Sequence, residues 1–186
     1  MDVLEAIQTR HSVGKVKPDA VSREIVEKLL SAAVQAPNHY NVRPWRFVVL
    51  TGEGRQRLGD VMAEVFHHKF PDVAPEALDK ERAKPLRAPL LIAVGVDKPA
   101  EARVVDIENI CAVAAACENL LLAAHGLGLA AQWRTGDVAR DPEVKKFLGL
   151  EPAQQLLAFL YVGYPDVLPA AVERPSFADR TTWIEA

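Results

Sequence analysis

Residues 104–131, VVDIENICAVAAACENLLLAAHGLGLAA, contain the longest apolar stretch of the chain. A helix from about Val104 to His125 would be apolar on nearly every side, and such a helix is buried on nearly every side. The stretch approaches the length of a membrane span, but Glu118, Asn119 and two glycines within it favour a buried helix followed by a turn. In a chain of 186 residues, this burial indicates that a second subunit covers part of the helix.

The end of this stretch, residues 126–131, matches the G-x-G-x-x-A pattern of dinucleotide-binding loops. In those loops a strand comes before the glycines and a helix follows, whereas here a long helix comes first and a strand follows. We therefore interpret the two glycines as a helix C-cap and a tight turn.

The other elements follow from local patterns and give an α+β fold. Helices outnumber strands and do not alternate strictly with them, which favours a central sheet that is mixed or mostly antiparallel and flanked by helices. No repeat or linker interrupts residues 1–186, so we expect a single domain. The segment from Pro165 onward has three prolines and resembles an arm that reaches over a neighbour. The expected helices are 3–9, 22–37, 54–69, 75–84 and 142–148, and the expected strands are 45–50, 89–96, 129–135 and 156–163.

Charge and cysteine content narrow the function classes. The formal net charge of -3 gives no general attraction to phosphate backbones, so nucleic acid is not an expected partner. Residues 1–6 have no basic segment followed by an apolar run, which predicts a cytoplasmic protein without a secretory signal. Cys111 and Cys117 lie on different sides of the expected helix and cannot bond to each other there.

A basic cluster follows the first helix. Arg10, His11 and Ser12, with Lys15 and Lys17 close behind, provide a guanidinium, an imidazole, a hydroxyl and two ammonium groups. A phosphate monoester is bound by such a set through charge-assisted hydrogen bonds. The alternative is an ordinary basic loop in which Ser12 is a cap.

Two further segments concentrate polar groups next to a strand. Residues 36–45, APNHYNVRPW, hold amide, imidazole and guanidinium groups that could bond the edge of a flat heterocycle, although turn chemistry with Trp45 in the core is the alternative. Residues 133–136, WRTG, end a later strand with hydrogen-bond donors, although Arg134 could also be a simple surface cation.

Other clusters favour plain structural explanations. His67 and His68 with Asp72 do not have the spacing of a metal site, because adjacent helical side chains point about 100° apart. Residues 80–87 contain several cations and are interpreted as an exposed helix end with a loop. No G-x-S-x-G, Walker A or C-x-x-C motif occurs, so the sequence gives no support to those chemistries.

In their order and spacing, four of these segments resemble the nitroreductase family of FMN enzymes. The resemblance covers nearly the whole chain, and the short length is most similar to the minimal members of that family. The segments are TRHSV (9–13), AP through NVRPWRF (36–47), NLLLAAHGLGL (119–129) and WRTG (133–136).

The resemblance implies an intertwined α+β homodimer with two FMN sites at the subunit interface, each built from both chains. Arg10, His11 and Ser12 of one chain would bind the FMN phosphate and the ribityl chain or the pyrimidine edge. Lys15 is a further candidate, because Gly14 stands where relatives often have a cation.

The remaining implied contacts come from two other segments. Trp133, Arg134 and Thr135 would lie along the flavin ring and its tail. A loop of the other chain would approach the same flavin, with cofactor-binding candidates at Pro37, Asn38, His39 and Asn41.

The implied activity is an NAD(P)H-dependent oxidoreductase that reduces small electron-poor acceptors such as nitroaromatics and quinones. NADH or NADPH would reduce FMN and leave before the acceptor enters, which is a ping-pong mechanism. Because the flavin carries the chemistry, no catalytic side chain and no metal are expected. The alternatives are an FMN enzyme of the same fold that performs dehalogenation or oxidises a special metabolite, and a flavin-binding or regulatory module without turnover.

Overall fold

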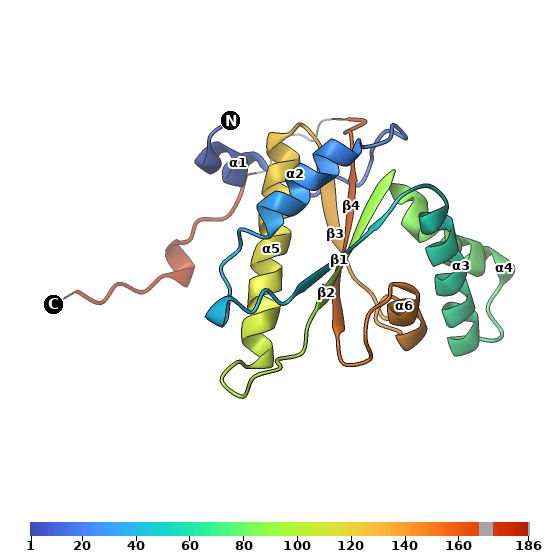
Figure 1. The fold of residues 1–186 in the computed structure, drawn as a ribbon. Coiled ribbons are helices and arrows are strands. Elements are labelled where there is room, and N and C mark those ends of the chain that lie inside the picture. Colours follow the sequence, from blue (N-terminus) through green and yellow to red (C-terminus); the bar gives the residue numbers. More distant parts are fainter. Residues whose placement is uncertain (168–172, 186) are drawn as a thin grey trace.

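The computed structural model describes residues 1–167 and 173–185. Its centre is a four-stranded antiparallel sheet in the order β1-β2-β4-β3 (Figure 1), which confirms the expected α+β class. The strands are β1 (Trp45–Leu50), β2 (Leu90–Val96), β3 (Ala130–Arg134) and β4 (Gln155–Gly163). The helices are α1 (Val3–Thr9), α2 (Arg23–Ala33), α3 (Gly52–Lys69), α4 (Pro75–Ala83), α5 (Asp106–Gly126) and α6 (Pro142–Phe147), with short 3-10 turns η1 (His39–Asn41), η2 (Lys84–Arg87) and η3 (Ala178–Arg180).

Helices cover both faces of the sheet. Figure 1 shows α2 and α5 on one side, and α3, α4 and α6 on the other. The central strand β2 is buried at all seven positions, because Leu90, Ile92 and Val94 pack toward α2 and α5 while Leu91 and Ala93 pack toward α3 and α6. This double coverage explains why β2 is a continuous apolar run rather than an alternating one.

Helix α5 is the core helix that its sequence predicts. Within the described residues, it is long and apolar enough to cross a membrane, but it packs across the sheet with eight of its residues buried. It ends at Gly126, and Gly128 has a φ of +75° in the turn that follows. The amide of Leu129 donates to the carbonyl of Ala124 at 2.8 Å, which confirms a helix C-cap rather than a phosphate-binding loop.

The two cysteines of α5 are not bonded to each other, as expected. Cys117 is buried and Cys111 is exposed, and both are free thiols. Burial, with a smaller contribution from the charge of Glu118, raises the pKa of Cys117 to about 12. Cys117 is therefore a core residue and not a nucleophile at neutral pH.

Helix α2 begins where its cap predicts and ends earlier than expected. The hydroxyl of Ser22 accepts a hydrogen bond from the amide of Ile25 at 3.4 Å. The helix ends at Ala33 rather than near Pro37, and Ala36 closes a turn by donating to the carbonyl of Ala33. A proline disfavours helical geometry in the residue before it, so the chain leaves the helix before this point.

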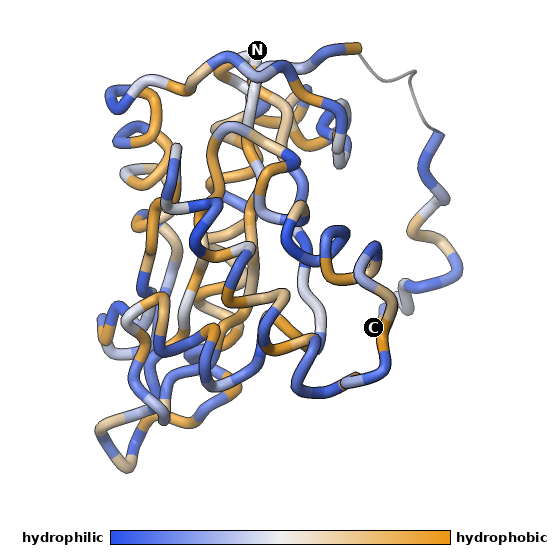
Figure 2. Tube along the Cα trace, turned by 90° about the vertical axis from the view of Figure 1, so that its right-hand side faces the viewer, coloured by the Kyte–Doolittle hydropathy of each residue, from blue (hydrophilic) through white to orange (hydrophobic). Residues whose placement is uncertain are grey.

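The C-terminal segment lies apart from the central elements. Figures 1 and 2 show the described residues 173–185 running away from the hydrophobic centre of the molecule. Trp183 and Ile184 are 75% and 96% exposed. Residues 168–172 of the expected arm lie outside the described residues, and its contact with a neighbour remains a prediction.

The close approach of α3 and α4 depends on Gly59. A Cβ atom at this position would lie 2.2 Å from the carbonyl oxygen of Arg82. We expect Gly59→Ala to lower the free energy of unfolding by roughly 1–3 kcal/mol, because the two helices must move apart. Urea denaturation followed by circular dichroism measures this change.

The control variant is Gly54→Ala in the same helix. A Cβ atom at Gly54 would meet only the Cβ of Leu50 at 3.9 Å, which is ordinary van der Waals contact. This variant should be neutral or slightly stabilising. Equal unfolding free energies for the two variants would contradict the role assigned to Gly59.

Candidate functional site

The basic loop after α1 lies against the edge strand β3. Ser12 forms an isolated parallel bridge with Ala131, and the amide of Val13 donates to the carbonyl of Ala131 at 3.2 Å. A Cβ atom at Gly14 would lie 2.8 Å from Oε1 of Gln132, so the loop passes directly over that side chain. The structure therefore brings two predicted site segments together from distant parts of the sequence.

The side chains of β3 continue this contact. Nε of Arg134 donates to Oε1 of Gln132 at 3.0 Å, and Nη2 of Arg134 lies 4.0 Å from the position of a Cβ atom at Gly14. Gln132 was not among the predicted site residues. Its strand position facing the loop was not visible in the sequence, because the pairing of Ser12 with β3 is a long-range contact.

Arg10 is held by two partners from other parts of the chain. Its Nε forms an ion pair with Oε1 of Glu118 at 3.2 Å, and its side chain is 18% exposed. Nη2 of Arg174 donates to the carbonyl oxygen of Arg10 at 2.6 Å. Arg174 thus adds a cation to the cluster of Arg10 and His11. Sequence reasoning missed Arg174, because no local motif marks it.

The positive charges of this cluster affect the pKa of His125 on α5. Its pKa is lowered by burial, and then by the charges of Arg10 and His11, which outweigh the opposite effect of Glu5. The hydroxyl of Thr9 donates to the carbonyl of Glu5 at 2.7 Å, so Nε2 of His125 is the donor in its 2.8 Å contact with that hydroxyl. His125 is therefore a neutral neighbour of the cation cluster at neutral pH.

A cavity of about 720 Å³ opens beside the end of β3. Its walls come from α3, from the α4–η2 segment, from the residues that follow β3, and from β4. Arg134, Thr135 and Gly136 of the WRTG segment line it. Four cationic and two acidic side chains share the lining with Met62 and aromatic side chains: Lys69, Lys84, Arg87 and Arg134, Glu81 and Asp137, and Phe66, Phe70, Phe159 and Tyr161.

The α4–η2 part of this wall agrees with the expected exposed helix end at most positions. Lys80, Arg82 and Arg87 are exposed and α4 ends at Ala83, but Glu81 is only 7% exposed and Pro85 is buried. Lys84 forms an ion pair with Oε1 of Glu81. The reason is that the segment packs against α3, so one side of it faces the cavity rather than solvent.

Trp133 lies on the other face of the sheet. Side chains alternate along a strand. Gln132 and Arg134 therefore share the face beside the basic loop, where Arg134 lines the cavity, while Trp133 packs against the core cluster under α2 and α5. Of the three predicted residues in this segment, Arg134 and Thr135 line the cavity and Trp133 does not.

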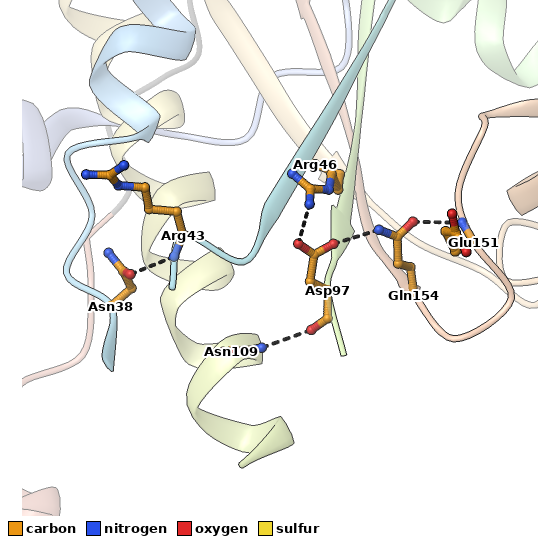
Figure 3. A network of polar contacts seen from close by, with 7 residues as sticks. All are labelled: Asn38, Arg43, Arg46, Asp97, Asn109, Glu151 and Gln154. Carbon is orange, nitrogen blue, oxygen red and sulfur yellow. Dashed lines mark hydrogen bonds and ion pairs between the residues drawn. The ribbon is translucent and has the colours of Figure 1, made fainter. Parts of the chain in front are cut away.

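The predicted loop of residues 37–41 contains strained backbone. Tyr40, Asn41 and Arg43 have φ values of 49°, 56° and 51°, a region that residues other than glycine seldom adopt. Oδ1 of Asn38 accepts a hydrogen bond from the amide of Arg43 at 2.8 Å (Figure 3), which closes the loop. Pro37, His39 and Asn41 are exposed.

This loop docks on the N-terminal part of α5. Nδ1 of His39 lies 3.8 Å from Oε1 of Glu108, and the guanidinium of Arg103 lies 4.1 Å from the centre of the Tyr40 ring. Arg10, by contrast, contacts Glu118, ten residues farther along α5. Ten residues of helix span about 15 Å. The two predicted halves of the site therefore do not meet within one chain.

A network around Asp97 fixes the base of the loop (Figure 3). Its carboxylate binds Nη2 of Arg46 at 2.7 Å and Nε2 of Gln154 at 2.6 Å, and its carbonyl accepts from Nδ2 of Asn109 at 2.9 Å. The amide of Asp97 donates to the carbonyl of Pro44 at 2.8 Å. These bonds tie β1, β2 and α5 together at the point where the loop enters the sheet.

The arrangement favours a ligand with a phosphate and an extended flat body. The basic loop provides charged donors, and the adjoining cavity offers aromatic and cationic walls. Within residues 1–167 and 173–185, no group of three or more His, Cys, Asp or Glu side chains is placed to hold a metal ion.

Comparison with known proteins agrees with this geometry. The family model described as the nitroreductase family matches residues 7–164. YdjA of Escherichia coli K12, named as a candidate NAD(P)H nitroreductase, is 31% identical over 167 residues, which cover 90% of each chain.

Two solved structures show the same fold. The nitroreductase-like family protein from Bacillus cereus has a TM-score of 0.87 at 26% identity, covering 100% of this chain and 97% of that one. A candidate nitroreductase from Desulfovibrio desulfuricans, solved in complex with FMN, has a TM-score of 0.75 at 28% identity, covering 100% and 98%. Since the family match includes the basic loop, the strained loop, α5 and the end of β3, the chain belongs to the nitroreductase family.

Proposed function

We propose that this chain is an FMN-dependent oxidoreductase that transfers hydride from NADH or NADPH to small electron-poor acceptors such as nitroaromatics and quinones. The observation that carries the proposal is the contact of the basic loop with β3, where Arg134 lies beside Gly14 of the loop and also lines the 720 Å³ cavity. The FMN in the Desulfovibrio desulfuricans relative and the name of YdjA support the choice of cofactor and reductant.

The residues present fit the phosphate end of FMN. Arg10, His11, Lys15 and Arg174 supply positive charge, and Ser12 supplies a hydroxyl on the loop that lies beside β3. Arginine and lysine form charge-assisted hydrogen bonds with phosphate oxygens. These residues would hold the tail of the cofactor.

The residues present also fit the ring end. Arg134 lies beside Gly14 of the basic loop and lines the cavity together with Thr135, and Lys84 and Arg87 add donors on its wall. Positive charge there favours a ring that carries negative charge. When bound, FMN supplies the hydride chemistry, while the protein supplies binding, orientation and electrostatics.

A second copy of the chain completes the site in this proposal. The loop with Pro37, His39 and Asn41 lies about 15 Å along α5 from the Arg10 region of its own chain, so the loop of a partner would approach the flavin. Exposed apolar side chains on α1 and at the start of α5 support a homodimer that covers them: Val3, Leu4, Ile7 and Ile107. The exposed Trp183 of the C-terminal segment would contact the partner in the same way.

Arg10→Gln should weaken FMN binding. Removal of a charge-assisted hydrogen bond costs about 1.5–3 kcal/mol, which corresponds to a roughly 10- to 100-fold higher Kd. Titration of the apoprotein with FMN, followed by quenching of flavin fluorescence, measures this change.

The matched control is Arg23→Gln, because Arg23 is an exposed cation paired with Glu27 on α2, away from the basic loop. It should leave the Kd unchanged. Failure of the wild-type protein to take up FMN, or equal Kd values for the two variants, would overturn the proposed phosphate site.

Two impaired variants, one in each half of the site, should complement each other when they form mixed dimers. Arg10→Gln and His39→Ala should each impair both sites of a homodimer, whereas a mixed dimer has one site with both residues intact. Random mixing of two-fold dimers should therefore restore about a quarter of the wild-type high-affinity FMN sites. Binding stoichiometry of the refolded or coexpressed mixture measures this recovery, and no recovery would contradict a site shared between chains.

Use of one cavity by both co-substrates predicts ping-pong kinetics. Initial rates of NADPH oxidation at several fixed quinone concentrations should give parallel double-reciprocal lines. Intersecting lines would indicate that both substrates bind together.

The alternative of a flavin-binding module has its own test. If the protein binds FMN but does not accelerate NADPH or NADH oxidation above the rate with free FMN, it is a flavin-binding module instead.

A further inference from the structure

A carboxylate and an ammonium group form a pair in the wall of the cavity. Oε1 of Glu81 on α4 binds Nζ of Lys84 at the start of η2. Oε2 of Glu81 is buried and has no hydrogen-bond partner among the described residues. The family assignment and the predicted FMN contacts do not account for this pair.

Three other cationic side chains line the same cavity as the Glu81–Lys84 pair. Arg87 and Arg134 line the same cavity, and Lys69 at its rim is paired with Asp141 at 2.9 Å. Tyr161 also lines the cavity, and its pKa responds to the charges around it. Its pKa is raised mainly by burial, while Arg87 and Arg134 act to lower it and Glu81 acts to raise it. Glu81 therefore opposes the positive field inside the cavity.

A purely structural role explains the pair poorly. The packing of α4 on α3 has other contacts, since the helices meet closely at Gly59 and Arg82 binds Asp60 at 3.0 Å. A buried carboxylate with an unpartnered oxygen costs stability, and apolar replacements of buried ion pairs are often neutral or stabilising. Departures of this kind from good packing are typical of functional sites.

We propose that Glu81 is a positioning residue that holds the ammonium of Lys84 in the cavity wall and offsets its charge, so that the cavity stabilises reduced FMN only moderately relative to oxidised FMN. This inference rests on the proposed function. It assigns to the Glu81–Lys84 pair the control of the flavin's reduction potential rather than the binding of its phosphate.

The direction of the effect follows from charge balance. A hydride carries two electrons and one proton from the nicotinamide, and its transfer to bound FMN would add one negative charge to the neutral oxidised ring. An unbalanced cation nearby favours that reduced ring. Because Glu81 balances Lys84, the potential of the bound flavin stays low and the flavin remains a strong hydride donor to the acceptor.

The test compares the Kd of oxidised FMN with the Kd of reduced FMN, both measured under anaerobic conditions. Glu81→Gln removes the negative charge but keeps an acceptor for Lys84, so the ratio of oxidised to reduced Kd should rise about tenfold. For a two-electron couple, this change corresponds to about 30 mV in potential.

Two further variants separate charge from position. Glu81→Met also removes the charge but offers no acceptor, so Lys84 is no longer held and the ratio should rise less than in Glu81→Gln. In a Lys84→Met background, Glu81→Gln should have a much smaller effect, because the ammonium group that Glu81 holds and offsets is absent. The exposed Glu76 on α4 provides the matched control, and Glu76→Gln should leave the ratio unchanged.

Three results would overturn the inference. One is an equal ratio in Glu81→Gln and Glu76→Gln. Another is a rise in Glu81→Met as large as in Glu81→Gln, and the third is a full effect of Glu81→Gln in the absence of Lys84. If the wild-type protein binds no FMN in either redox state, the proposed function fails instead, so the two failures are distinguishable.

Discussion

The burial of α5 against the sheet is the contact on which the rest of the molecule depends. Val113, Cys117 and Leu120 are fully buried in the cluster between α5, α2 and the inner strands. The same helix carries Glu118, which holds Arg10, and Glu108, which lies beside His39. Because the helix is rigid over this length, it fixes the distance between the two predicted halves of the site.

That fixed distance links the fold to the proposed function. A site that needs both the Arg10 cluster and the His39 loop is incomplete in one chain, and a symmetric dimer would complete two of them at once. The apolar side chains of α1 and Trp183 and Ile184 of the C-terminal segment are exposed in a single protomer. In the proposed function, a second copy of the chain packed along α5 would account for both features.

In the proposed function, the charged side chains of the basic cluster and those of the cavity wall have two separate roles. The cluster of Arg10, His11 and Arg174 gathers positive charge where a phosphate would bind. On the cavity wall, Glu81 reduces the positive field that Lys84, Arg87 and Arg134 would otherwise create. Strong attraction for the tail and moderate attraction for the ring allow tight binding without trapping the reduced form of the cofactor.

By itself, the sequence determined the helices and strands, the end of α5 at Gly126 and the order of the segments that carry the family resemblance. These are local properties, set by apolar periodicity, caps and turn residues within a few positions of each other. The tertiary structure alone decided that Ser12 lies beside Ala131, that Arg174 reaches Arg10, that Trp133 faces the core, and that Glu81 and Lys84 line a cavity. Such contacts depend on strand register and on helix packing between residues far apart in the chain, and no local pattern in the sequence encodes them.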